Sequence, residues 1–301
     1  MYHVLVLIFA LVAMTLALAF AVWISFPSAK ALRIHGERFA REHLAFVDSE
    51  FVVPFDRAYT RNRRQLAVMF VALIAAMLVL DRFARGYASD LVLLPIAGLM
   101  ALCVALLRLR MAGREFPVPS GRSVVARVRR VGLDDYVSRP VRTASWIVVC
   151  FCLGMAAWAT VHPYTGEYAP ATRLVPALAA GTLVVALVVV EVVGRAVCGR
   201  PQAAVDPCHL YFQDAWRGVF LVGAYVWVSW GAFQFLTSVP LYVLEDLPDS
   251  YFSFLGLAVV AEFACLFRSR RYFRARLWPT LLPGQVLHPG QSIPTKPEVF
   301  A

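Results

Sequence analysis

The chain has 301 residues, of which 60% are hydrophobic and only 16% are charged, and its formal net charge at pH 7 is +10. An average soluble domain carries about 25% charged residues, and a soluble protein of this length could not bury so much apolar surface. The composition therefore excludes an ordinary soluble domain and indicates an integral membrane protein.

Seven apolar stretches approach the length of a transmembrane helix, which needs about 20 residues to cross roughly 30 Å of hydrocarbon. In chain order they are Val4–Phe26, Leu66–Leu80, Leu91–Leu107, Thr143–Val161, Leu174–Val193, Gly218–Val239 and Tyr251–Phe267. The second, third and seventh are short, so they either extend by several residues or lie where the bilayer thins. The sequence predicts an all-α, polytopic transmembrane helix bundle of seven spans.

Basic residues are concentrated in four of the segments between these stretches. Twenty-six of the 29 lysine and arginine residues lie after the first, third, fifth and seventh spans. Short connections rich in these residues stay in the cytoplasm when a membrane protein inserts. One topology satisfies every connection, with the N-terminus outside and the C-terminus inside. Membrane retention then explains the net charge, and no recognisable nucleic-acid-binding module accompanies it.

The first apolar stretch has an alternative interpretation as a cleavable signal peptide. Its leader, Met1 to His3, has no positive charge, and its basic residues follow the apolar run. The run also exceeds the about 7–15 residues usual for a signal peptide. These features favour a retained anchor helix, although Ala29-Lys30-Ala31 resembles a cleavage site.

Four regions follow from this topology. They are an anchor helix at residues 1–29, a cytoplasmic segment at 30–65, six spans in three hairpins at 66–277 and a cytoplasmic tail at 278–301. Glu37 with Arg41 and Arg38 with Glu42 have helical spacing, so the cytoplasmic segment is predicted to form an amphipathic helix on the inner membrane surface. The five prolines of the tail predict an irregular, mobile chain.

Two glutamates within the predicted spans are the main candidate site residues. An ionised carboxylate in hydrocarbon costs several kcal/mol unless it is paired, hydrated or protonated. Glu191 has Arg195 four residues later on the same helical face, whereas Glu262 has no basic residue at that spacing. One interpretation is a polar site linked to a proton or a cation. The other is a set of ion-paired residues near the cytoplasmic ends of the helices.

Gln234 is a third candidate for the intramembrane polar site. It lies among tyrosine and tryptophan residues of the sixth span, which could line a pocket with apolar walls and a few hydrogen-bonding groups. The alternative is an aromatic belt at the membrane interface, because tryptophan and tyrosine are enriched there.

The last two hairpins share a local pattern. Each has a tyrosine six residues before an arginine at the entry to its first helix, and a glutamate on the returning helix. These residues are Tyr136, Arg142 and Glu191 in one hairpin and Tyr211, Arg217 and Glu262 in the next. The pattern predicts that the bundle is built from repeated hairpins, with coincidence as the alternative.

The densest basic cluster consists of Arg127, Arg129 and Arg130. It is a candidate contact for the anionic headgroups of the bilayer, and an acidic cytoplasmic partner is the alternative. Cys150 and Cys152 point to opposite sides of a helix and cannot hold one metal ion together. The sequence contains no phosphate-binding loop or nucleophile elbow, so no cofactor or metal is predicted and no enzymatic class is supported.

Residues Glu191 to Arg217 carry a resemblance to a known group. This stretch contains Arg195, Arg200-Pro201-Gln202, Asp206-Pro207 and Asp214. It resembles a group of uncharacterised multi-pass membrane proteins of high-GC actinobacteria. The resemblance implies a bacterial plasma-membrane location and carries no activity.

Two functions of different classes fit these features. In the first, the chain is a membrane component of a transport system of unknown substrate, alone or with a cytoplasmic ATPase or other membrane subunits bound to its basic inner loops. In the second, it is a non-catalytic scaffold or a regulatory subunit of a larger envelope complex. The intramembrane glutamates favour the first, and stripes of small residues that permit close helix contact favour the second.

Overall fold

The computed structural model describes residues 89–113, 125–126, 131–161, 169–204, 207–243 and 272–278, together with Arg64 and Val68. Several predicted features lie outside these residues. They are the first and seventh spans, the second span apart from Val68, the cytoplasmic segment apart from Arg64, the cluster Arg127, Arg129 and Arg130, and Glu262.

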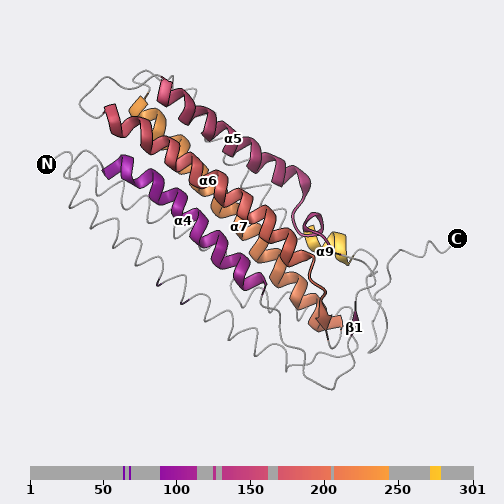
Figure 1. Ribbon diagram of the computed structural model, residues 1–301. Coiled ribbons are helices and arrows are strands. Elements are labelled where there is room, and N and C mark those ends of the chain that lie inside the picture. The colour runs from indigo at the N-terminus through magenta and orange to yellow at the C-terminus, as the bar shows by residue number, and fades with distance from the viewer. Residues whose placement is uncertain are drawn as a thin grey trace.

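Four long helices make up most of the described chain. They are α4 (Ser89–Ala112), α5 (Arg139–Val161), α6 (Ala169–Cys198) and α7 (Pro207–Val243), and they lie lengthwise beside one another in Figure 1. They coincide with the third to sixth predicted spans. The remaining described elements are the 3-10 turn η2 (Leu133–Asp135), the short helix α9 (Tyr272–Leu277) and a pair of two-residue antiparallel strands, β1 (Val125–Ala126) and β2 (Ala203–Ala204). The helical class is therefore confirmed for these residues.

Three of the helices are long and apolar enough to cross a membrane. The qualifying stretches are Arg139–Val161, Val175–Cys198 and Leu210–Leu236. Their lengths of 23, 24 and 27 residues exceed the about 20 residues that the hydrocarbon core requires. These helices fit an integral membrane protein, as the composition predicts.

The helices begin before their apolar stretches do. α5 starts at Arg139 rather than Thr143, and α7 starts at Pro207 rather than Gly218. Proline is favoured in the first turn of a helix, because the backbone N–H that it lacks would have no partner there. The extra turns carry charged residues that a hydropathy pattern leaves out.

α7 is the most buried of the three membrane-length helices. It packs against α4, α5 and α6, and 78% of its apolar stretch is buried, compared with 28% for α5 and 44% for α6. The outer faces of α5 and α6 instead expose large apolar side chains, including Ile147, Phe151, Val188 and Val192. Such continuous apolar exposure is rare on a soluble protein, and it is the surface that a spanning helix presents to lipid.

Two glycines leave room for groups of a neighbouring helix. A Cβ on Gly98 of α4 would overlap the Thr182 hydroxyl of α6, and a Cβ on Gly223 of α7 would overlap the Arg108 guanidinium of α4. Small residues at such crossings let helix backbones approach closely inside membranes. At these two positions α4 is in close contact with α6 and α7.

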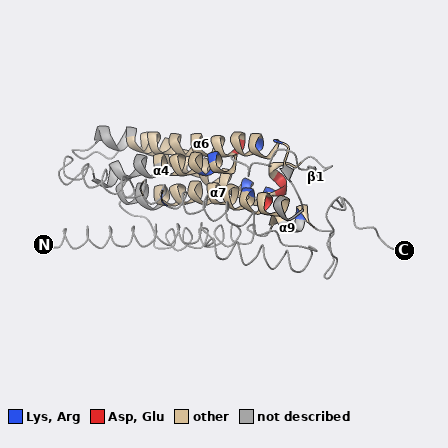
Figure 2. Ribbon diagram, turned by 90° about the horizontal axis from the view of Figure 1, so that it is seen from below, with Lys and Arg blue, Asp and Glu red and all other residues tan. Residues whose placement is uncertain are grey.

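Charged residues of the described helices gather toward one end of the bundle, the end where β1 and α9 lie (Figure 2). η2 enters this end and leads into α5. Its geometry is fixed by Asp135, whose Oδ2 accepts a hydrogen bond of 2.9 Å from the Gly132 backbone N–H. The turn places Asp134 and Tyr136 beside the helix ends.

The predicted mobile tail begins at Trp278, and this residue is buried with only 4% of its surface exposed. Its indole also packs edge-on against Tyr211, with 5.5 Å between the ring centroids. The described structure thus continues through Trp278. Its buried ring packs against Tyr211, and this contact favours an ordered position over a mobile one. The residues after Trp278 lie outside the described chain.

Candidate functional site

Glu191 on α6 accepts four hydrogen bonds from three side chains. Arg142 of α5 donates from Nε to Oε1 at 2.8 Å and from Nη2 to Oε2 at 2.6 Å. The Tyr225 hydroxyl of α7 donates to Oε1 at 2.8 Å, and Arg195 Nη2 donates to Oε2 at 3.1 Å. The paired bonds from Arg142 match the planar fork of a guanidinium to a carboxylate, the strongest geometry for such a pair.

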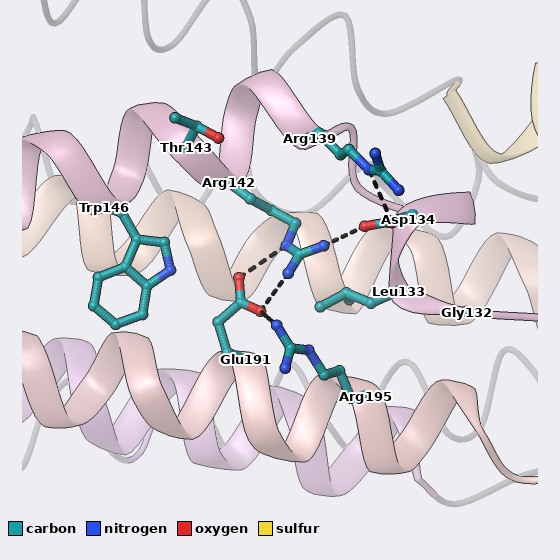
Figure 3. Close-up of a pocket in the computed structure, with 9 residues that line it drawn as sticks. All are labelled: Gly132, Leu133, Asp134, Arg139, Arg142, Thr143, Trp146, Glu191 and Arg195. Atoms are coloured by element: carbon teal, nitrogen blue, oxygen red, sulfur yellow. Dashed lines mark hydrogen bonds and ion pairs between the residues drawn. The ribbon is translucent and has the colours of Figure 1, made fainter.

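A second carboxylate extends this arrangement toward solvent. Asp134 of η2 accepts a hydrogen bond on Oδ1 from Arg142 Nη1, and its Oδ2 accepts one from Arg139 Nε at 3.1 Å. Figure 3 shows Arg142 lying between the two carboxylates and Arg195 approaching Glu191 from the other side. We call these six residues the Glu191 cluster: Asp134, Arg139, Arg142, Glu191, Arg195 and Tyr225.

Exposure increases steadily from the centre of this cluster to its edge. The side chain of Glu191 is 7% exposed and that of Arg142 is 17% exposed, whereas Arg195 reaches 66% and Arg139 reaches 82%. A pair as shielded as Glu191 and Arg142 is little screened by salt, while exposed pairs contribute only about 0–1 kcal/mol. The inner pair therefore holds α5 to α6, and the outer arginines add mainly positive charge.

The cluster borders an open pocket of about 530 Å³. The residues that line it are Gly132, Leu133, Asp134, Arg139, Arg142, Thr143, Trp146, Glu191 and Arg195, shown in Figure 3. Three arginines and two carboxylates among them leave an excess of one positive charge. The volume falls within the about 300–1,000 Å³ typical of small-molecule sites.

Most of the polar groups left over in this pocket are donors. No partner is described for Arg139 Nη1 and Nη2, for Arg195 Nε and Nη1, for the Thr143 hydroxyl or for the Trp146 indole N–H. All four oxygens of the two carboxylates, by contrast, already accept hydrogen bonds. Since guanidinium and indole groups only donate, the pocket is suited chemically to an anion.

A separate set of polar residues surrounds Asp214 of α7, which is completely buried. Its Oδ1 accepts hydrogen bonds from the Tyr136 hydroxyl at 2.8 Å and from Gln202 Nε2 at 2.9 Å. Its Oδ2 accepts one from Trp278 Nε1 at 2.9 Å. We call these four residues the Asp214 network. It joins η2, the loop before β2 and the residue after α9 to one point on α7.

The predicted site residues are placed in different ways. Glu191 and Arg195 form the expected ion pair across one helical turn, at 3.1 Å. Gln234 is not among the pocket residues, and it lies nine positions after Tyr225 on α7, roughly 13 Å further along the helix. Its part in a shared polar site remains a prediction, as does that of Glu262.

The sequence interpretation missed the partners of Glu191 on other helices. The sequence pattern places Arg142 and Glu191 in the same hairpin without pairing them, and it does not connect Asp134 or Tyr225 with Glu191. One available signal was topology, since the start of α5 and the end of α6 must lie at the same end of a helical hairpin. The expected divergence of the two thiols is seen: Cys150 is exposed, whereas Cys152 is buried with its Sγ 3.7 Å from the Ala232 carbonyl oxygen.

Comparison of the chain with protein-family models, with curated proteins and with solved structures gives no match. The geometry of the pocket and the apolar, membrane-length helices are therefore the features that bear on function.

Proposed function

We propose that this protein is a membrane component of a transport system, located in a bacterial plasma membrane. The observation that carries the proposal is the open, positively charged pocket between two membrane-length helices, α5 and α6. Transporters place their polar residues where helices leave the hydrocarbon or surround a wet cavity, since charge is costly elsewhere. The pocket has this position and offers donors to a ligand.

The proposed topology has seven spans, with the N-terminus outside and the C-terminus inside. In this topology the start of α5 and the end of α6 face the cytoplasm. The Glu191 cluster then lies at the cytoplasmic boundary, where basic residues are retained and where an ATPase subunit would bind. Reporter fusions after residues 113 and 200 should report the cytoplasm, and a fusion after residue 165 should report the outside.

The geometry changes the role proposed for Glu191. A residue that binds a transported proton or cation needs an available oxygen, but both oxygens of Glu191 accept hydrogen bonds from Arg142, and Arg195 and Tyr225 occupy them further. Its role in this proposal is to position Arg142 and Arg195. The solute recognised at the pocket is accordingly an anion.

The second candidate function is a non-catalytic scaffold or regulatory subunit. The dense interior around α7 favours it, because the tight crossings at Gly98 and Gly223 leave helices α4, α6 and α7 in direct contact. These contacts hold α4, α6 and α7 together, as a scaffold requires.

Affinity purification of the full chain in mild detergent distinguishes the two candidates. A copurifying ATPase or solute-binding subunit would support a transport system. A stoichiometric cell-envelope assembly that contains no such subunit would overturn the transport proposal and support the scaffold. The same purification with an Arg142→Gln variant would locate the binding surface. If the partner no longer copurified with this variant, the partner would bind the end of the bundle that contains the Glu191 cluster.

A further inference from the structure

We propose that the pocket beside Glu191 binds the phosphate headgroup of an anionic phospholipid that reaches it from the bilayer. The inference rests on the proposed membrane placement of α5 and α6, and it names the class of ligand for the same pocket. It does not depend on whether the protein transports that ligand.

The headgroup chemistry follows from the unused donors. Four residues of the pocket lining carry donor groups without a described partner. These groups are the terminal nitrogens of Arg139, the Nε and Nη1 atoms of Arg195, the Thr143 hydroxyl and the Trp146 indole N–H. A phosphate has several strong acceptor oxygens and at least one negative charge, which match a donor-rich site with one excess positive charge. A cation would meet the excess positive charge of the pocket, where Asp134 already accepts hydrogen bonds from two arginines.

Access from the bilayer follows from the side chains next to the pocket. On α5, Ile147 directly follows the pocket residue Trp146 and is 64% exposed. On α6, Val192 and Val188 lie one and three residues from Glu191 and are 60% and 42% exposed. These apolar side chains extend from the pocket along both outer helix faces, and acyl chains attached to a bound headgroup would lie against them.

The apolar side chains next to the pocket favour a phospholipid over a soluble phosphate as the ligand. A site for a free phosphate needs only the donors, whereas here the donors stand at the end of two exposed apolar helix faces. Arginine and tryptophan are also the side chains that occupy the boundary between headgroups and hydrocarbon. A glycerophosphate headgroup with its acyl chains uses both parts of the surface.

The test compares lipid binding by the purified full-length protein and a pocket variant. Native mass spectrometry from mild detergent would count the phosphatidylglycerol molecules bound to the wild type and to the double variant Arg139→Gln/Arg195→Gln, with phosphatidylcholine as the neutral lipid. The variant should lose about tenfold in phosphatidylglycerol affinity, since each basic residue near anionic lipid contributes a factor of about five and the two sites are partly screened. Phosphatidylcholine, whose phosphate is balanced by its own choline cation, should lose less affinity than phosphatidylglycerol.

Arg110→Gln is the matched control, because Arg110 is an exposed arginine in the last turn of α4 and does not line the pocket. This variant should bind phosphatidylglycerol as the wild type does. Equal losses in both variants would show general charge attraction and overturn the site. An unchanged double variant would overturn it as well.

Competition with inorganic phosphate is the last part of the test. If millimolar phosphate displaced no phosphatidylglycerol, a ligand anchored by both headgroup and acyl chains would be supported. If phosphate bound the pocket as tightly as the lipid did, the lipid assignment would fail while an anion-transport function would survive. Failure of the transport proposal in the purification experiment would leave the lipid result unaffected.

Discussion

Two buried carboxylates on adjacent helices have different hydrogen-bond partners and different access to solvent. Glu191 of α6 lies at the edge of the bundle and is bound by two arginines and a tyrosine, while Asp214 of α7 lies inside and is bound by a tyrosine, a glutamine and a tryptophan. The first is continuous with an open pocket. The second has no exposed surface.

The difference shows how a membrane protein can hold acidic side chains for two purposes. The described donors to Asp214 are neutral and come from three different parts of the chain, so that carboxylate fixes how those parts meet α7. The donors to Glu191 are mainly charged and lead from the shielded Arg142 to the exposed Arg195, so that carboxylate holds positive charge at the pocket. The comparison predicts large stability effects at Asp214 and small ones at the pocket edge.

The largest expected effect is that of Asp214→Ala. It would leave the Tyr136 hydroxyl and the Trp278 indole N–H buried without their described acceptor, and each such loss costs about 1–3 kcal/mol. We expect the free energy of unfolding to fall by about 4 kcal/mol in total. Thermal unfolding in detergent, followed by intrinsic fluorescence, would measure this as a marked drop in Tm.

Asp214→Asn is the matched variant for this prediction. The amide oxygen can still accept from Tyr136 and Gln202, but the amide nitrogen would face the Trp278 N–H as a second donor. It should therefore be less damaging than alanine. Equal stability of wild type and Asp214→Ala would contradict the structural role assigned to this carboxylate.

The next largest effect is a loss of stability at the contact between α4 and α7. In Gly223→Ala the new methyl group would lie 2.7 Å from the Arg108 Cζ atom, closer than any real contact, and Arg108 is fully buried. Overpacking of this kind typically costs about 1–3 kcal/mol. Gly154→Ala on α5 is the control, because a methyl group there meets no atom within 4 Å.

Thermal unfolding should rank these two glycine variants clearly. Gly154→Ala should match or slightly exceed the wild type, since alanine is the better helix former by about 1 kcal/mol. If both variants had the wild-type Tm, the close crossing of α4 and α7 would not exist as described.

A third effect measures the pair at the centre of the Glu191 cluster. A double-mutant cycle with Arg142→Gln and Glu191→Gln should give a coupling energy of about 2 kcal/mol, within the range of pairs that share hydrogen bonds. The coupling should change little between low and high salt, because both side chains are shielded. A coupling near zero would mean that α5 and α6 are held together without this pair.

The smallest expected effect is that of Arg195→Gln. An exposed partner in an ion pair across one helical turn contributes about 0.3–0.5 kcal/mol, and salt reduces it further. Tm should stay within about 1 °C of the wild type under the size scaling of unfolding. A large loss of stability would instead place Arg195 with the interior residues and would weaken its assignment as a ligand donor.

Hydropathy and charge were enough to predict the positions of α4 to α7, because long apolar runs leave a helix few alternatives in a bilayer. The same patterns could also predict the pair of Glu191 with Arg195, since both residues lie on one helix with fixed spacing. They could not predict Arg142 as the closer partner, which depends on how α5 and α6 are rotated about their axes. Asp214 shows this limit more strongly, because its partners come from a turn, a loop and the residue after α9.

The starts of α5 and α7 were missed for a related reason. Charged residues interrupt the apolar stretches at the starts of these helices and resemble loop residues when only the sequence is considered. They are Arg139, Arg142, Asp214 and Arg217. In the folded chain the Glu191 cluster and the Asp214 network supply partners for Arg142 and Asp214, so the helices continue through these positions. Tertiary contacts thus decided where the helices begin.

The 37 residues of α7 give it a length of about 55 Å, whereas the hydrocarbon core is roughly 30 Å thick. Asp214 near its start is bonded to three other parts of the chain, so α7 cannot slide past those parts. A helix held in this way cannot slide to suit a thicker or thinner membrane. Lipids around it must stretch or compress instead, so the free energy of the protein will depend on acyl chain length.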